Sequence, residues 1–458
     1  MRSLGADSFV TVATTVAKPV PVGLQPPVPA SAPAARRAGA AGRPTPTRLR
    51  LTATGLTFAI LALLAVTAAS FFEAQARAST VTSRARTATQ AGDLYFALAD
   101  LDAEAARLVL LGDGDLNPGD GEYDGNQLSA MIAYNTRTAQ VDADLQELAA
   151  DGANSTAIAA EVTTYRSIAD AAIGFDQFPG SSAGQPEPTA IGFYGRATTL
   201  MQGQVLPDAA HLRDETAAAS TQAAAAARSW ALAGLIGTLV LGIVTVVGLV
   251  LAQRRLFAVF RRTLNPALLI ATAVTVGLVG GAALALGATA RDAGSAGARL
   301  STYLQVVRTR ADSYDADGTA VRSVLMPDAF GRVQLTTQEQ TVDQDLAKLG
   351  PAAGAAQALW TKGPVADYGT ILAAVSAGQT ANALTVETGT ARGDDAFDFF
   401  DYDQALQTLD TQRLASFRAA SDGLSSDVGP WLLWPWILAG VSLILVALAF
   451  RPRLAEYR

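Results

Sequence analysis

The chain has 458 residues, half of them apolar, with no cysteine and a single histidine. It therefore contains no disulfide and no thiolate metal site, and one histidine cannot build a histidine metal cluster. The formal net charge of −7 is divided between short basic segments and long acidic ones, which argues against nucleic-acid binding.

The first 49 residues are rich in proline and alanine and show no apolar periodicity. Segments of this composition stay extended and solvated, because they have too few apolar side chains to bury a core. We predict that residues 1–49 form a disordered cytoplasmic tail. Its expected role is that of an inert tether, and the alternative is a docking segment for a cytosolic partner.

Four apolar runs without Asp, Glu, Lys or Arg follow this tail, the first beginning at Leu51. A helix of about 20 apolar residues can cross the hydrocarbon core of a bilayer. A cleaved signal peptide is the alternative for the first run, but an apolar core of 22 residues after a leader of 50 is too long for one. We therefore predict an integral membrane protein. The predicted transmembrane helices are residues 50–72, 230–252, 266–288 and 431–450.

The charges between the spans predict the orientation in the plasma membrane. Residues 1–50 carry seven Lys or Arg and one acid, whereas residues 73–229 carry 9 basic and 21 acidic residues and residues 291–430 carry 11 and 18. Basic flanks stay in the cytoplasm, so both termini and the link 253–265 are predicted inside, and the acidic segments outside. The tail 451–458 is cytoplasmic in this topology. The arginines of the link are the candidate cytoplasmic relay: Arg254, Arg255, Arg261 and Arg262.

The two outer segments, residues 73–229 and 289–430, are predicted to be helical. Apolar residues between Leu94 and Leu108 recur at alternating steps of four and three, which is the seam of a bundle helix, and the stretch 300–325 follows the same steps. No proline separates either seam from the preceding span. One helix is therefore predicted to run from the membrane into each outer segment.

Three further helices are predicted in each outer segment, the last of them fused to the following span. With the first helix they form an up-down-up-down four-helix bundle. The predicted helices are 127–150, 156–175 and 191–228 in the first segment, and 333–349, 365–377 and 397–425 in the second.

An internal repeat relates the two outer segments. The stretch 102–113 aligns without gaps with 317–328, and six of the twelve positions are identical. The spacing Val-x-x-Tyr-x-x-Ile also recurs, around Tyr165 and Tyr368. We therefore predict an all-α membrane protein built from two copies of span, outer bundle and span. In this architecture two four-helix bundles stand in tandem outside the membrane, and their helices continue into the spans.

No enzyme constellation is recognisable in the sequence. His211, the single histidine, is expected on a helix surface, and there is no GxxxxGK[ST] phosphate loop and no kinase or phosphatase signature. No ionisable side chain lies within the four apolar runs, which disfavours an ion or proton pathway and hence a transporter subunit. We predict no enzymatic activity and no cofactor.

Arg107 and Arg322 are the strongest candidates for ligand or partner binding. They occupy equivalent places in the repeat, near the outer end of the first helix of each segment. Such an arginine could bind a carboxylate in bidentate fashion. The alternative is an ion pair within the protein, for example with Glu104. Asp113 and Asp328, which end the repeated stretch, are the accompanying candidates.

The loop 112–126 is acidic, and its oxygen-bearing side chains begin with the spacing of a calcium loop. However, Pro118 stands where the turn glycine belongs, and Asp124 replaces the bidentate glutamate. We expect a solvated turn here, with a calcium site as the alternative.

Gly277 and Gly281 form a GxxxG pair in the third span. Small residues let helices approach closely, so packing among the four spans is the expected role. A homodimer contact, or a surface along which helices slide, is the alternative.

The layout of long helices, with the repeated stretches 102–113 and 317–328, resembles the four-helix-bundle sensor domains of bacterial chemoreceptors and sensor kinases. The chain has no HAMP-like linker, kinase or methyl-accepting hairpin. With its Ala/Pro/Arg-rich leader, the layout of residues 51–450 resembles the actinobacterial GlnX-type transmembrane signalling proteins. This resemblance implies an extracytoplasmic solute-binding lipoprotein that carries an amino acid as one partner, and a cytoplasmic Ser/Thr kinase as the other. It supplies no catalytic residues.

We therefore predict a transmembrane signal relay. The outer bundles would sense the lipoprotein or a small solute, and a helix shift of about 1–2 Å would reach the arginine link. The alternative is a structural scaffold of the cell envelope without a ligand-dependent state.

Overall fold

The computed structural model describes residues 45–112, 122–177, 181–260, 266–389, 391–426 and 429–455. Residues 49–458 form one compact unit, to which the following description applies. Regular structure in the described residues is helical throughout, apart from one isolated β-bridge between Ser182 and Gln185. The all-α prediction is confirmed. The predicted tail lies almost entirely outside the described residues.

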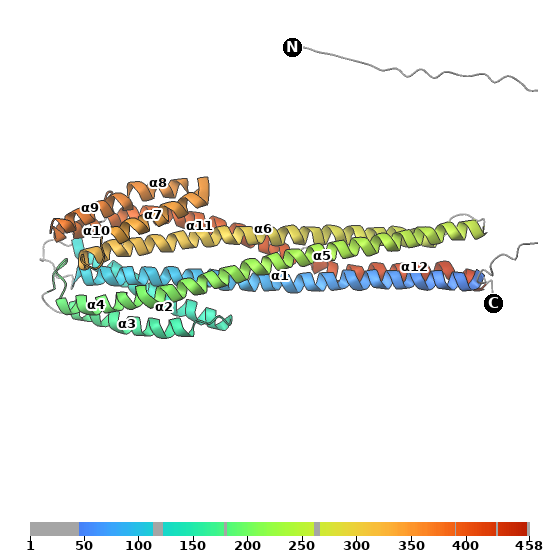
Figure 1. The fold of residues 1–458 in the computed structure, drawn as a ribbon, viewed down its shortest axis with the longest axis horizontal. Coiled ribbons are helices and arrows are strands. Elements are labelled where there is room, and N and C mark those ends of the chain that lie inside the picture. Colours follow the sequence, from blue (N-terminus) through green and yellow to red (C-terminus); the bar gives the residue numbers. More distant parts are fainter. Residues whose placement is uncertain are drawn as a thin grey trace, which may run out of the picture. The chain divides into compact units, whose positions relative to one another are not determined.

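Four helices contain an apolar stretch long enough to cross a bilayer: α1 (Thr45–Leu111), α5 (Leu206–Phe260), α6 (Pro266–Leu325) and α12 (Trp434–Ala455). In Figure 1, α1, α5 and α6 run alongside one another. α1 and α6 extend from their spans into the outer segments without interruption. α4 (Pro188–Leu200) joins α5 through a single π-helical turn, η1 (Met201–Val205). Three of the four spans are therefore continuous with outer helices, as predicted.

The surface of the spans is made of large apolar side chains. Phe58 is 73% exposed, Ile243 60% and Leu284 73%. A contiguous apolar surface of this kind is unfavourable in water and is solvated by lipid in a bilayer, where the helical backbone satisfies its own hydrogen bonds. This apolar surface and the four apolar helices together indicate a multi-pass membrane protein.

Small residues bring the spans close together. A Cβ added at Gly242 of α5 would overlap the side chain of Val279 of α6, and one at Gly234 would lie 2.8 Å from Ser70 of α1. The two glycines of the predicted GxxxG pair differ in what they face. A Cβ added at Gly281 would overlap the edge of the Trp431 ring, whereas nothing lies within 4 Å of a Cβ placed on Gly277.

The predicted continuity is wrong at the fourth span. α11 (Asp395–Ser426) is separated from α12 by the 3-10 turn η3 (Gly429–Leu432) and by a turn at Leu433. The sequence there contains Gly429-Pro430 and, two residues after Leu433, Pro435. Proline lacks an N–H group and disfavours helical geometry in the residue before it, so Pro430 and Pro435 favour a break in the helix at this point.

The first outer segment is completed by α2 (Glu122–Ala150) and α3 (Thr156–Asp176), and its helices agree with the predicted ones. The second is more divided than predicted. Its helices after α6 are α7 (Arg332–Leu349), η2 (Gly350–Ala353), α8 (Gly354–Lys362), α9 (Pro364–Ser376), α10 (Thr380–Thr388) and α11. α8 and α10 have nine residues each and lie outside the predicted helices. A stretch this short shows too little periodicity to predict a helix.

The two outer segments share one hydrophobic core. Its buried residues include Leu98 and Leu101 of α1, Val321 of α6, Tyr165 of α3 and Trp360 of α8. Figure 1 shows α2 and α3 on one side of the long helices and α7 to α9 on the other. The tandem arrangement of two independent bundles is therefore not confirmed. The repeated units pack against each other along α1 and α6.

Candidate functional site

The repeated stretches of α1 and α6 meet at their aligned residues. Ala103 and Gly318 occupy the same position of the repeat, and a Cβ on Gly318 would lie 3.1 Å from the Cβ of Ala103. Glycine permits this close approach of the two helices. Residues on either side of the contact are consequently brought together as equivalent pairs.

Two reciprocal ion pairs flank this contact. Arg322 Nη1 donates to Asp102 Oδ2 at 2.7 Å, and Arg107 Nη2 donates to Asp317 Oδ2 at 2.5 Å. In the repeat, Arg107 corresponds to Arg322, and Asp102 corresponds to Asp317. Each copy thus supplies an arginine to the aspartate of the other. Both aspartates are fully buried.

In the pair at Asp102, Arg322 Nε has no hydrogen-bond partner among the described residues, but both carboxylate oxygens of Asp102 are engaged. Besides Arg322, its carboxylate accepts hydrogen bonds from the Tyr165 hydroxyl at 3.0 Å and the Thr198 hydroxyl at 2.9 Å. Arg322 also donates to the Thr319 hydroxyl at 2.7 Å and to Asp315 Oδ1 at 3.1 Å. Buried charges of this kind are tolerated when each is paired and hydrogen-bonded.

The pair at Asp317 has a different environment. Arg107 is shared among Asp317, Glu104 at 2.9 Å and Glu387 of α10 at 3.4 Å. Asp395, at the start of α11, completes the set. One carboxylate oxygen from each of Asp317, Glu387 and Asp395 lies within 4.8 Å of the others, and all three residues are buried. This cluster is the one place in the described residues where three potential metal ligands converge.

Burial dominates the electrostatics of this cluster. It raises the pKa of Glu387 to about 8, with the negative charge of Asp317 adding to the effect and Arg107 opposing it. Burial likewise raises the pKa of Asp395 well above its ordinary value, reinforced by Glu387 and Asp317. Both shifts express the cost of placing a carboxylate in a medium of low polarity near other carboxylates.

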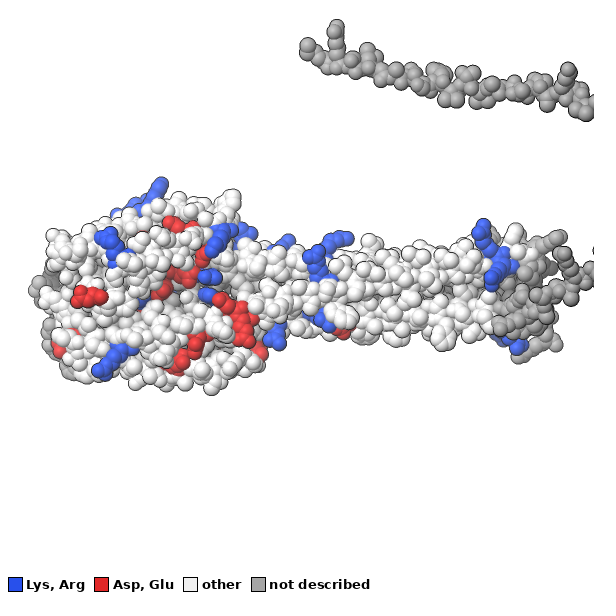
Figure 2. Space-filling model, viewed as in Figure 1, with Lys and Arg blue, Asp and Glu red and all other residues white. Residues whose placement is uncertain are grey.

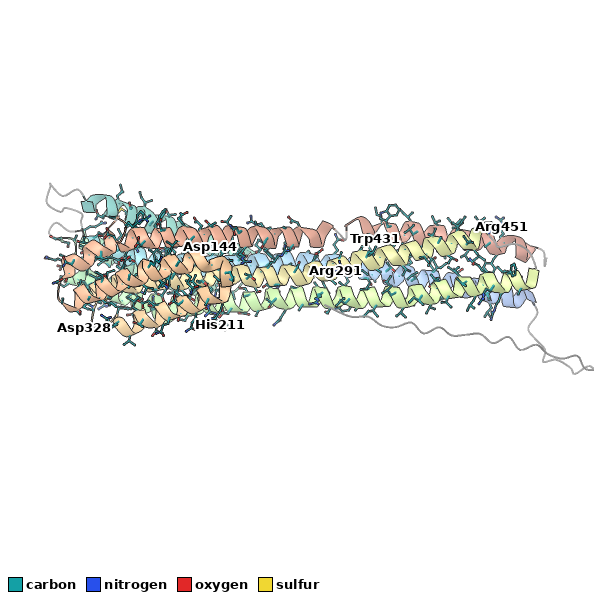
Figure 3. The ribbon with its side chains drawn as sticks, turned by 90° about the horizontal axis from the view of Figure 1, so that it is seen from above. Asp144, His211, Arg291, Asp328, Trp431 and Arg451 are labelled. Carbon is teal, nitrogen blue, oxygen red and sulfur yellow. The ribbon has the colours of Figure 1, made fainter. Side chains whose placement is uncertain are left out.

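The arginines predicted to bind a ligand are thus engaged within the protein, which was the alternative reading. The Arg322 side chain has no exposed surface, and that of Arg107 is 17% exposed. A binding role for either arginine stays a prediction. Asp328 is exposed in the turn after α6 (Figure 3). Asp113 and the greater part of the loop 112–126 lie outside the described residues.

Sequence reasoning missed Glu387 and Asp395. Asp317 and Tyr368 both stand in repeated motifs, so a signal for them existed. Glu387 lies on α10, which was not predicted. No repeat or spacing distinguishes Glu387 or Asp395 from the other acidic residues of the outer segments.

At the opposite end of the protein, Arg254 and Arg255 are exposed near the end of α5, and Arg261 and Arg262 lie outside the described residues. Figure 2 shows charged side chains gathered over the outer segments, a long and nearly uncharged stretch along the spans, and basic side chains again beyond it. Charge thus marks the two ends of the membrane-spanning region.

Comparison with known families supports a sensory role for the first outer segment. Residues 77–225 match the family model described as an actinobacterial sensor domain. This range covers nearly all of the segment 73–229, namely the outer part of α1 together with α2, α3, α4 and the outer part of α5. The predicted resemblance to sensor proteins is confirmed at this level. No curated protein and no solved structure matches the chain.

Proposed function

We propose that the protein is a transmembrane signal relay whose outer segments sense a solute-binding lipoprotein, loaded with an amino acid, or a small solute. The observation that carries this proposal is the continuity of α1, α6 and the α4–α5 helix between the outer core and the membrane. A packed helix is stiff along its axis, so a displacement at its outer end is carried to its inner end.

The reciprocal ion pairs support coupling between the two outer segments. Arg107–Asp317 and Arg322–Asp102 both join α1 to α6, so a ligand that moves one helix also acts on the other. A ligand shifts such an equilibrium only by its difference in affinity for the two states. The sensed molecule would therefore bind more tightly to a state in which α1 and α6 are displaced than to the state without ligand.

The proposed cytoplasmic partner is a Ser/Thr kinase. The segments placed inside the cell by the charge pattern are 1–49, 253–265 and 451–458, and none carries a kinase signature. The exposed Arg254 and Arg255 provide a basic contact surface for such a partner at the inner end of α5. This assignment, like that of the lipoprotein, rests on the resemblance to GlnX-type proteins.

Disulfide crosslinking tests the relay directly, because the natural chain contains no cysteine. A Cβ on Gly92 of α1 would lie 3.9 Å from the Cβ of Val307 of α6, which is close to the separation found in disulfides. In membranes containing Gly92→Cys/Val307→Cys, we expect the crosslinking rate to change when the loaded binding lipoprotein is added. A rate that stays constant with every candidate lipoprotein and amino acid would favour the structural scaffold instead.

The proposed orientation has its own test. His211, whose side chain is 82% exposed, lies on the outer part of α5, and Arg254 lies near its opposite end. In intact cells, a membrane-impermeant maleimide should label His211→Cys and leave Arg254→Cys unlabelled until the membrane is opened. The reverse pattern would place the acidic segments in the cytoplasm and end the proposal.

A further inference from the structure

The two copies of the repeat differ around their buried aspartates. Tyr165 of α3 and Tyr368 of α9 occupy the same place in the motif Val-x-x-Tyr-x-x-Ile. The Tyr165 hydroxyl donates to Asp102 at 3.0 Å. The Tyr368 hydroxyl, although fully buried, has no hydrogen-bond partner among the described residues. The tyrosine of the first copy thus donates to the buried aspartate of its own copy, whereas the equivalent tyrosine of the second copy has no partner among the described residues.

Tyr368 is buried on α9, and α9 packs against α6, α10 and α11, the three helices that carry the carboxylate cluster. The pKa of the Tyr368 hydroxyl is raised above the ordinary value first by burial and then by the negative charges of Asp395, Asp317 and Glu387, in that order. A buried hydroxyl without a partner loses the free energy of its hydrogen bonds to water. This position therefore calls for a partner that the protein itself does not supply.

The carboxylates of the cluster are also incompletely partnered. Arg107 contacts one oxygen of Asp317 and one of Glu387. The remaining oxygens, Asp317 Oδ1, Glu387 Oε2 and both oxygens of Asp395, accept no hydrogen bond from an N–H group or hydroxyl of the described residues. The Asp395 carboxyl group is within hydrogen-bond reach of the carboxylates of Asp317 and Glu387, so the cluster needs a proton or a cation between these groups. When ionised, the three acids carry three negative charges, and Arg107 can offset at most one because it also pairs with Glu104. A deficit of two positive charges remains.

We propose that Asp317, Glu387 and Asp395, with the Tyr368 hydroxyl at their edge, form a binding site for a hard divalent cation of the Ca²⁺ or Mg²⁺ class. All of the available ligands are oxygens, mostly anionic, and such ligand sets select these ions over softer metals. One divalent ion removes the charge deficit. It also gives the unpartnered oxygens a common ligand, with water completing the coordination.

The position of the cluster indicates what the cation does to the fold. Its ligands come from α6, α10 and α11, so a bound ion ties the short α10 to the long helix α6. Glu387 and Asp395 stand on either side of the α10–α11 connection, where Ala391, Arg392 and Gly393 are exposed. This site is distinct from the loop 112–126, and the inference does not depend on the relay.

Terbium luminescence provides a direct test on the full-length protein in detergent or nanodiscs. Trp360 packs against Tyr368 with ring centroids 5.9 Å apart, so Tb³⁺ held at the cluster would be sensitised by a nearby tryptophan. We expect Tb³⁺ emission on tryptophan excitation, competition by Ca²⁺ or Mg²⁺, and a higher melting temperature with either ion. Trp360→Phe should abolish the emission and preserve the rise in melting temperature.

Variants of the ligands separate a specific site from nonspecific binding to the acidic surface. Asp395→Asn and Glu387→Gln should each weaken Ca²⁺ or Mg²⁺ binding by about 10–100-fold or more, a loss usual for damage to a metal site. Asp395→Asn removes a carboxylate without an ion-pair partner among the described residues, and Glu387→Gln keeps an oxygen that can accept from Arg107 at the same place, so both variants are expected to fold. Tyr368→Phe should weaken binding, whereas the matched variant Tyr165→Phe in the first copy should leave it unchanged.

The proposal would be overturned if wild-type protein gave no sensitised emission and no rise in melting temperature with millimolar Ca²⁺ or Mg²⁺. It would be overturned equally if Asp395→Asn and Glu387→Gln bound these ions as tightly as the wild type. In either case the cluster holds protons in place of a cation.

Discussion

At the scale of single residues, the pair Asp102–Arg322 joins the two repeats at the cost of burying two charges. Neither side chain has exposed surface, and the pair is hydrogen-bonded to Tyr165 and Thr198. Burying the pair is expensive, but breaking it is more so, because the remaining charge is left in a nonpolar environment. The pair therefore specifies how α1 and α6 pack more than it adds to stability.

Removal of one partner tests this account. Arg322→Met should lower the free energy of unfolding by about 3–5 kcal/mol, because Asp102 then remains buried without a cation. Adding Asp102→Asn to Arg322→Met should recover part of the loss. The exposed pair Arg392–Asp401 is the control, with side chains 81% and 38% exposed, and Arg392→Met should change stability by no more than about 0.5 kcal/mol. Thermal unfolding in nanodiscs measures all three, and equal effects at both sites would contradict the argument.

Only the candidate residues that recur at equivalent positions of the two repeats could be predicted from the sequence. Arg107 and Arg322 stand out because identical residues recur at equal positions in two copies. Their partners could not be predicted, since the reciprocal pairing requires α1 and α6 to pack at Ala103 and Gly318. A sequence pattern records which side chains share a helix face and does not record which other helix that face contacts.

At the scale of elements, the length of α1 follows from the absence of helix breakers. The sequence between the first span and Leu111 contains no proline, and α1 is unbroken over that length. The break before α12 was equally visible in Pro430 and Pro435, but the apolar run was read as a continuation of the preceding helix. The short helices α8 and α10 depend on packing in the second outer segment. Local propensity alone does not specify helices of this length.

The glycines of the spans provide a test at this scale, because they differ in what they face. Gly242→Ala should lower the free energy of unfolding by about 1–3 kcal/mol, since the added methyl group overlaps Val279 in a packed interface. Gly277→Ala meets open space and should be neutral or stabilising by up to about 1 kcal/mol through helix propensity. Melting temperatures in the same nanodiscs compare the two. A larger loss for Gly277→Ala would mean that this glycine contacts a second copy of the protein.

At the scale of the whole molecule, the order of spans and outer segments was predictable and their association was not. Apolar runs and the repeat define the spans and the two outer segments. The shared core arises because each outer segment buries a face of its first helix against the other segment. An apolar seam has the same sequence whether its neighbour belongs to the same copy of the repeat or to the other.

The contact between the outer segments also contains an acidic cluster that makes stability depend on pH. Burial raises the pKa of Asp93 on α1 to about 7, from 3.8, reinforced by Asp144 and Asp410, opposed by Arg310 and raised further by Glu147. Asp144 and Glu147 lie on α2, whereas Arg310 and Asp410 belong to the second outer segment, on α6 and α11. The carboxylates of two segments therefore repel one another where the segments meet.

The sign of the pH effect follows from the direction of this shift. The pKa of Asp93 is 3.8 in the unfolded chain and about 7 in the folded protein. Between these two pH values the folded state therefore binds more protons than the unfolded state. Stability must then fall as the pH rises through this window. Asp93→Asn removes the dependence, so the variant should be more stable than the wild type at about pH 8, with a smaller difference between about pH 5 and pH 8. Glu215→Gln, at a side chain 71% exposed, is the control and should leave that difference unchanged. If Asp93→Asn instead lost stability at high pH, the Asp93 carboxylate would be held there as an anion by Arg310, and the two segments would attract each other at this contact.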